Sequence, residues 1–130
     1  MKKLQYHFAQ LTKFLLILPL TGCFCMQKME VLPKSLPNAK VGNPYYAKIE
    51  VWGGKVIDYS FYYDIKPENS GLELSIPSYF ESHVSYNDLE VKGIPKAAGA
   101  INIELIGDTY GTMTCVGRDF KKVYNIKVEE

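Results

Sequence analysis

The chain has 130 residues, which is room for one domain rather than two. Hydrophobic residues make up 47% and charged residues 22% of it, a globular composition that excludes a disordered chain. The net charge of +1 lacks the cationic excess of a nucleic-acid-binding protein, so we expect no nucleic-acid partner.

The first 22 residues are predicted to be an export signal. This segment holds three lysines and no acid, and an apolar run extends from residue 14 to residue 20. The run is shorter than the roughly 18–20 apolar residues that a membrane-spanning helix needs, and Pro19 interrupts it. We therefore interpret residues 1–22 as a signal peptide and not as a membrane span.

The sequence after this run, Leu20-Thr21-Gly22-Cys23, resembles the lipobox of bacterial lipoproteins. The resemblance implies cleavage before Cys23, a diacylglycerol on its thiol and an acyl chain on its new amine, which together anchor a protein stably. Phe24 follows Cys23, where an Asp would favour the inner membrane. The resemblance therefore implies an outer-membrane anchor, with the domain facing the periplasm. The alternative is an ordinary signal peptide with an incidental cysteine.

Cys25 and Cys115 are the two cysteines that remain. An even number of cysteines in an exported chain is typical of a disulfide. This disulfide would close a loop of about 90 residues and stabilise the fold by roughly 4 kcal/mol. The alternative is that Cys25 is a second lipid-side thiol and Cys115 a buried strand residue.

Residues 23–35 are predicted to be the lipidated cysteine followed by a flexible tether. Pro33 lies there among polar residues, and no helical apolar period is present. From residue 36 to residue 130 the sequence changes to short runs of β-forming residues, separated by Gly, Pro, Asn and Asp. We therefore place a single domain at residues 36–130.

The strand-like runs are residues 45–51, 56–64, 72–76, 88–92, 100–105, 112–116 and 123–128. In the first run, alternation places Tyr45, Ala47, Ile49 and Val51 on one face. Gly53-Gly54 is a hairpin signal between the first two runs, and turns are expected at residues 107–111 and 117–119. The pattern predicts an all-β fold, a single Ig-like antiparallel β-sandwich of seven or eight strands.

Several short motifs, in this order, resemble the Ig-like, cadherin-like modules of bacterial surface proteins. They are Val41-Gly42-Asn43-Pro44-Tyr45, Gly71-Leu72-Glu73-Leu74, Val91-Lys92-Gly93-Ile94-Pro95, Asp108-Thr109-Tyr110-Gly111 and Tyr124-Asn125-Ile126-Lys127-Val128. The resemblance covers about residues 36–128, and the segment from Ser78 to Asp88 is longer and more aromatic than is usual in the family. It implies a fold and an adhesive or adaptor role, but no chemistry.

Candidate catalytic and metal-binding residues are few. His83 is the one histidine after residue 23, and no nucleophile motif surrounds it. A zinc site needs three or four His, Cys or carboxylate ligands, and the clustered acids of a calcium loop are missing from the sequence. We therefore expect no catalytic residue, no metal and no cofactor.

A surplus of aromatic residues is the main candidate for a binding surface. Tyr79, Phe80, His83 and Tyr86 lie in a loop-like segment, and Tyr62 lies in a strand-like run. Tyrosines on loops offer contact area at a low entropic cost, so we expect these five residues to bind a protein partner. The alternative is that half of these rings fold inward and close the core.

These observations favour an outer-membrane-anchored periplasmic lipoprotein that acts as a non-enzymatic, protein-binding Ig-like module. The alternative is a periplasmic immunity lipoprotein that neutralises a toxin delivered by a competing cell. An immunity protein should hold one partner at nanomolar affinity, and an adhesive module should not. A third hypothesis, an envelope enzyme, depends only on scattered carboxylates and His83.

Overall fold

The computed structural model describes residues 3, 5, 25, 28–78 and 84–130. Within residues 28–78 and 84–130 the chain forms eight β-strands and one 3-10 turn, η2 (Asp58–Ser60). The strands are β1 (Glu30–Leu32), β2 (Ala39–Lys40), β3 (Tyr45–Trp52), β4 (Tyr62–Lys66), β5 (Leu72–Ser75), β6 (Asp88–Gly93), β7 (Gly99–Asp108) and β8 (Asp119–Glu129).

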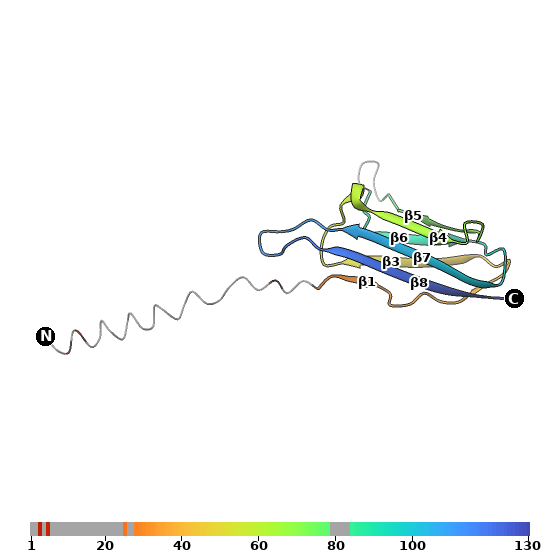
Figure 1. Ribbon diagram of the computed structural model, residues 1–130, viewed down its shortest axis with the longest axis horizontal. Coiled ribbons are helices and arrows are strands. Elements are labelled where there is room, and N and C mark those ends of the chain that lie inside the picture. Colours follow the sequence, from red (N-terminus) through yellow and green to blue (C-terminus); the bar gives the residue numbers. More distant parts are fainter. Residues whose placement is uncertain (1–2, 4, 6–24, 26–27, 79–83) are drawn as a thin grey trace.

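The strands form two four-stranded sheets that pack face to face (Figure 1). One sheet has the order β1-β3-β6-β5, and the other has the order β2-β8-β7-β4. Neighbouring strands are antiparallel except β2, which runs parallel to β8 and places Ala39 opposite Val128. The predicted all-β sandwich of seven or eight strands is confirmed, with this one parallel pair as the departure.

Alternating side chains from both sheets form the core between them. In β3, Tyr45, Ala47, Ile49 and Val51 are buried and the residues between them are not, as the alternation predicts. The largest fully buried side chains are those of Tyr124, Ile49, Leu89, Ile103, Leu105, Ile126, Val91 and Pro95. Each large aliphatic side chain buried in this way contributes about 1.5–3 kcal/mol.

Part of the predicted tether belongs to the folded domain. β1 lies within residues 23–35 and pairs with β3, with Val31 opposite Val51. Val31 is buried in the core. The sequence does not show this strand because three residues are too few for an alternation to be visible. The predicted domain boundary at residue 36 is therefore too late.

Two tyrosine hydroxyls fasten the segment that follows β1. Tyr124 donates a hydrogen bond to the Pro33 carbonyl over 2.6 Å, and Tyr45 donates one to the Pro37 carbonyl over 2.9 Å. Leu36, between these two prolines, is buried. The N-terminal segment thus lies along the sandwich from β1 onward.

Gly53-Gly54 does not form the predicted hairpin. It leads from β3 in one sheet to β4 in the other, so the chain crosses between the sheets here. Gly53 has a φ of 101°, and a Cβ at this position would lie 2.6 Å from the Lys28 carbonyl oxygen. Glycine is therefore required by both the backbone conformation and the close approach of the N-terminal segment.

The predicted strand at residues 56–64 is interrupted. Val56 makes an isolated bridge to Thr109, η2 follows, and β4 begins only at Tyr62. The residues are rich in β-formers, but β-propensity reports how side chains fit a sheet and not where the chain changes sheets.

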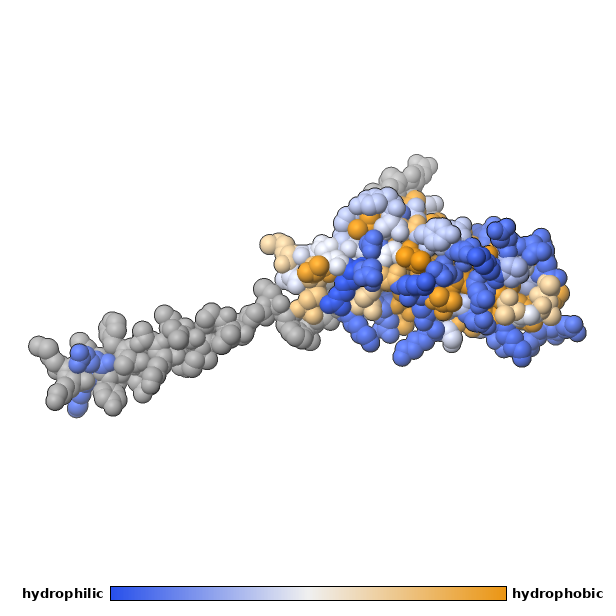
Figure 2. Space-filling view, viewed as in Figure 1, coloured by the Kyte–Doolittle hydropathy of each residue, from blue (hydrophilic) through white to orange (hydrophobic). Residues whose placement is uncertain are grey.

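β7 and β8 form one long hairpin that ends with Asp108 opposite Asp119. The predicted turn at residues 107–111 starts too early, and the predicted strand at residues 112–116 is instead part of the loop at the end of this hairpin. Threonine and valine favour strands, but in the described structure these residues have no neighbouring strand to pair with. Figure 2 shows hydrophilic and apolar side chains mixed over this face, with apolar atoms at the surface at both ends and in the middle of the domain.

Candidate functional site

Three connections gather at one end of the sandwich, which we call the loop end. They are residues 53–61 between β3 and β4, the described residues 76–78 and 84–87 between β5 and β6, and residues 109–118 between β7 and β8. β1 begins at this same end, because Glu30 lies opposite Trp52. The C-terminus lies at the opposite end of the domain (Figure 1).

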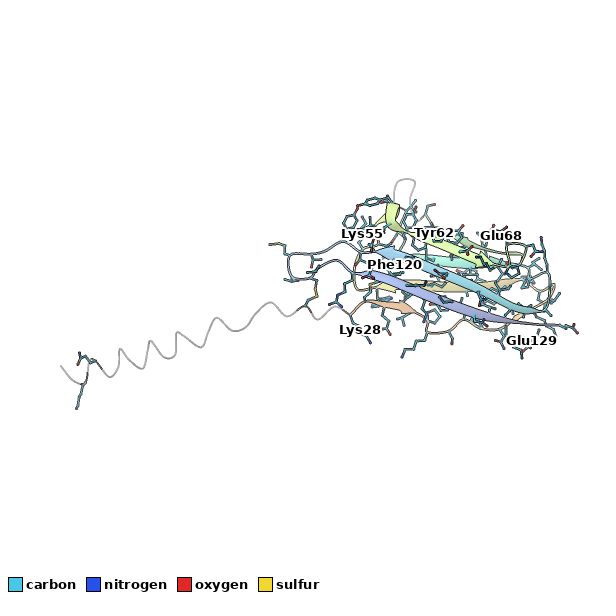
Figure 3. The ribbon with its side chains drawn as sticks, in the orientation of Figure 1. Lys28, Lys55, Tyr62, Glu68, Phe120 and Glu129 are labelled. Atoms are coloured by element: carbon cyan, nitrogen blue, oxygen red, sulfur yellow. A yellow bond between two sulfur atoms is a disulfide. The ribbon has the colours of Figure 1, made fainter. Side chains whose placement is uncertain are left out.

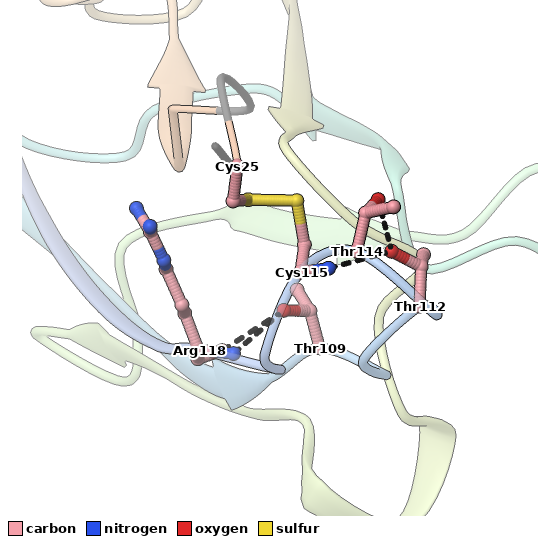
Figure 4. Close-up of a disulfide and its surroundings, with 6 residues drawn as sticks. All are labelled: Cys25, Thr109, Thr112, Thr114, Cys115 and Arg118. Atoms are coloured by element: carbon pink, nitrogen blue, oxygen red, sulfur yellow. Dashed lines mark hydrogen bonds between the residues drawn. A yellow bond between two sulfur atoms is a disulfide. The ribbon is translucent and has the colours of Figure 1, made fainter. Parts of the chain in front are cut away.

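A disulfide joins Cys25 to Cys115 in the β7–β8 loop, with the two Cα atoms 5.1 Å apart (Figure 4). The two residues are 90 positions apart, so the bond ties the N-terminal segment to the loop end. Of the two alternatives that the sequence leaves open, the structure has the paired one. Cys115 lies in a loop and not in a strand.

Thr109 closes the base of the β7–β8 loop (Figure 4). Its Oγ1 donates to the Arg118 carbonyl over 3.1 Å and accepts from the Arg118 N–H over 3.0 Å. Gly117 lies so close to the Thr109 carbonyl that a side chain would not fit. Nearer the tip, the Cys115 N–H donates to Thr112 Oγ1 over 3.1 Å. These bonds hold the disulfide-bearing loop in one shape.

Asn87 fastens the β3–β4 connection to the sheet. Its Nδ2 donates to the Val51 carbonyl over 2.8 Å and to the Gly54 carbonyl over 2.7 Å. Its Oδ1 accepts from the Val56 N–H over 3.0 Å. Both donors of the side-chain amide are therefore used. Asn87 also lines two pockets of about 110 Å³ and 510 Å³.

Aromatic side chains surround the start of β4, where Tyr62 is labelled in Figure 3. Tyr59 is 84% exposed, Tyr62 59% and Tyr63 41%. The ring of the half-buried Phe61 lies 6.3 Å from that of Tyr63 and 5.3 Å from that of Tyr86, distances at which aromatic rings attract one another. Tyr62 lies on the opposite face of β4 from Tyr63, because successive residues of a strand alternate. We call these five residues around the start of β4 the aromatic cluster.

The turn η2 presents Tyr59 and is tied to β7. Ser60 Oγ accepts a hydrogen bond from the Asp108 N–H over 2.9 Å and donates one to the Ile57 carbonyl over 2.8 Å. Asp58 Oδ1 accepts from the Tyr59 N–H over 2.9 Å. The backbone that carries the Tyr59 ring is therefore held by hydrogen bonds, which lowers the entropic cost of a contact through this ring.

The structure describes two of the five predicted partner-binding residues. Tyr62 is exposed on the outer face of its sheet, and Tyr86 is half-buried against the core. The expectation of an exposed ring thus fits Tyr62, and the alternative of inward packing fits Tyr86 better. The other three residues lie outside the described part: Tyr79, Phe80 and His83.

The exposed side chains at the loop end that are not among the predicted residues include Tyr59, Met113 and Val116. Tyr59 is missed because η2 breaks the strand alternation without a local signal. Met113 and Val116 are 105% and 86% exposed. They are missed because residues 112–116 are predicted to be a strand.

Perturbed titratable groups do not mark a reaction centre in the described residues. Burial raises the pKa of Tyr45, and raises that of Tyr124 to about 12, but both hydroxyls bind backbone carbonyls. A hydrogen bond and charge pairing with Asp64, 3.2 Å away, raise the pKa of the exposed Lys66. The described residues contain no group of three His, Cys, Asp or Glu side chains that could hold a metal ion. The loop end mainly offers aromatic and apolar contact area.

The predicted signal peptide and its lipobox lie outside the described residues, Cys23 included. Lipidation of Cys23 therefore stays a prediction from the sequence. In the part of the chain that the structure describes, no helix has the length and apolar character of a membrane span.

No protein-family model and no curated protein matches the chain. Among solved structures it is similar to the S-layer protein SbsC domains 4 and 5, with a TM-score of 0.40 and 14% sequence identity. The similarity covers 77% of this chain and 51% of that one, so the chain spans about half the length of its neighbour. The resemblance of the short motifs to cadherin-like modules stays a prediction.

Proposed function

We propose that this chain is a lipid-anchored, non-enzymatic domain of the cell envelope that binds a protein partner through its aromatic cluster. The lipobox-like Leu20-Thr21-Gly22-Cys23 sequence supports the anchor. The observation that carries the binding role is the exposure of Tyr59 and Tyr62 on a hydrogen-bonded backbone.

The aromatic cluster has the composition of an interface centre. Tyrosine is enriched among residues whose loss costs about 2 kcal/mol or more in binding. Polar pairs adjoin Tyr62 on the same face of the sheet, which suits the polar rim around such a centre. These pairs are Lys66 with Asp64 at 3.2 Å and Lys121 with Glu104 at 3.1 Å.

Photo-cross-linking in living cells tests this proposal. A photoreactive amino acid at position 59 or 62 should form an adduct with a discrete protein. The same amino acid at Lys127, exposed near the other end of the same sheet, is the matched control and should form none. Adducts that are absent from all three positions, or equal at all three, would contradict the proposal. The identity of the captured protein then separates an envelope component from an incoming toxin.

Substitution of the rings gives a quantitative check with the purified partner. Replacing Tyr59 and Tyr62 together by serine should weaken binding by about 100-fold or more, because two contact tyrosines are removed. The melting temperature should stay nearly unchanged, since both side chains are exposed. Unchanged affinity would show that the interface lies elsewhere.

A further inference from the structure

The tip of the β7–β8 loop carries apolar side chains that the domain leaves exposed. Met113 is 105% exposed and Val116 is 86% exposed. Single exposed apolar residues are common on soluble proteins and need no explanation by themselves. Here two of them lie on either side of Cys115, whose disulfide connects this loop to the N-terminal segment.

The disulfide fixes the distance between this tip and the predicted lipid anchor. Cys25 is two residues after Cys23, and two residues of extended chain span at most about 7 Å. The Cα atoms of Cys25 and Cys115 are 5.1 Å apart. Cys115 is therefore held within about 12 Å of Cys23, and acyl chains on Cys23 would place its loop at the membrane surface.

Cations lie around the tip beside one acid, Asp58, which lines a pocket with Lys55 and Tyr110. Residues 109–118 contain no acid and one cation, Arg118. Lys55 lies beside the loop, because its carbonyl accepts a hydrogen bond from the Tyr110 N–H over 2.9 Å. Lys28 lies near the same end, as Figure 3 shows. Exposed cations next to apolar side chains favour contact with lipid headgroups, which are anionic in part.

We infer that the β7–β8 tip, which projects beyond the β3–β4 connection (Figure 1), inserts into the surface of the membrane that holds Cys23. Met113 and Val116 enter the boundary between headgroups and acyl chains, and Tyr110 lies at the headgroup level, where tyrosine is favoured. Asp108 and Asp119, opposite each other at the base of the hairpin, limit the depth. This inference rests on the proposed anchor and goes beyond it, because an anchor alone does not orient a domain.

Fluorescence quenching by lipids with brominated acyl chains tests the inference. Trp52 is the one tryptophan of the chain, so Trp52→Phe provides a dark background. In this background Met113→Trp reports on the tip. The matched control is Ile94→Trp, a 51% exposed apolar position after β6 at the opposite end. The protein, isolated with its N-terminal modification, is reconstituted into vesicles of phosphatidylethanolamine and phosphatidylglycerol.

The vesicles should carry the protein on flotation. The tryptophan fluorescence of the Met113→Trp variant should be quenched and blue-shifted, and that of the Ile94→Trp variant should not. Flotation with both positions unquenched, or with both equally quenched, would overturn the oriented docking and leave the anchor standing. Failure to float would contradict the anchor itself and, with it, the docking.

A second pair of variants separates insertion of the tip from simple proximity to the bilayer. Val116→Trp should be quenched in the same background, and adding Met113→Asp should reduce that quenching, because a carboxylate resists entry into the apolar region. Flotation should stay the same, since the acyl chains provide it. Equal quenching with and without the aspartate would overturn insertion.

Discussion

Replacing Asn87 by alanine should destabilise the domain by about 2–4 kcal/mol, because three hydrogen bonds are lost at once. The substitution leaves the Val51 and Gly54 carbonyls without their side-chain donor and the Val56 N–H without its acceptor. Val56 is only 3% exposed, so water replaces its partner poorly. The pockets beside Asn87 let water reach the carbonyls more easily, which keeps the expected loss below the sum of three buried bonds.

Urea unfolding followed by Trp52 fluorescence measures this loss of stability. An unchanged m-value would show that the variant and the wild type expose the same surface on unfolding. Asn125→Ala is the matched control, because the Asn125 amide makes one exposed hydrogen bond, 2.7 Å long, to Asn102. The Asn125→Ala substitution should change the free energy of unfolding by no more than about 0.5 kcal/mol. Asn87→Asp should be worse than alanine at neutral pH, since a carboxylate would face two carbonyls, and should partly recover toward pH of about 4. An Asn87→Ala variant as stable as wild type would refute the reasoning.

Three further predictions concern the N-terminal segment. Replacing Cys25 and Cys115 by serine should lower the free energy of unfolding by about 4–5 kcal/mol, because the bond closes a loop of 90 residues in the unfolded chain; urea titrations of the serine variant and wild type measure it. The folded state keeps the Tyr124 proton up to a pKa of about 12, whereas the unfolded chain releases it near 10. The wild type should therefore lose stability as the pH rises between these values. The Tyr124→Phe variant should lose less, as urea titrations at a series of pH values would measure. Cys23→Ala should move the protein from the membrane to the soluble fraction on centrifugation of cell extracts; continued detergent-sensitive pelleting would contradict the anchor.

The parts of the fold that depend on alternation could be predicted from the sequence. β3 and the middle of β7 show polar and apolar residues in strict turn, because each has one face on the core and one in water. β1 could not be found, because its three residues are defined by pairing with β3 and not by a pattern of their own. The crossover at Gly53-Gly54 was equally hidden, since the same glycines would suit a hairpin.

The candidate site was only partly visible in the sequence. The exposure of Tyr62 follows from its place on an outer face, but that of Tyr59 depends on η2, whose hydrogen bonds to β7 are long-range. The position of Cys115 beside two exposed apolar side chains likewise depends on the β7–β8 loop not being a strand. Long-range contacts of this kind leave no local pattern.

Mass spectrometry of the N-terminus tests the proposed lipid anchor most directly. After isolation from membranes, reduction and digestion with trypsin, we expect a peptide that begins at Cys23 and ends at Lys28, with a diacylglycerol on the thiol and an acyl chain on the amine of Cys23. A mature protein that begins at another residue, or one that begins at Cys23 without lipid, would contradict the proposed anchor.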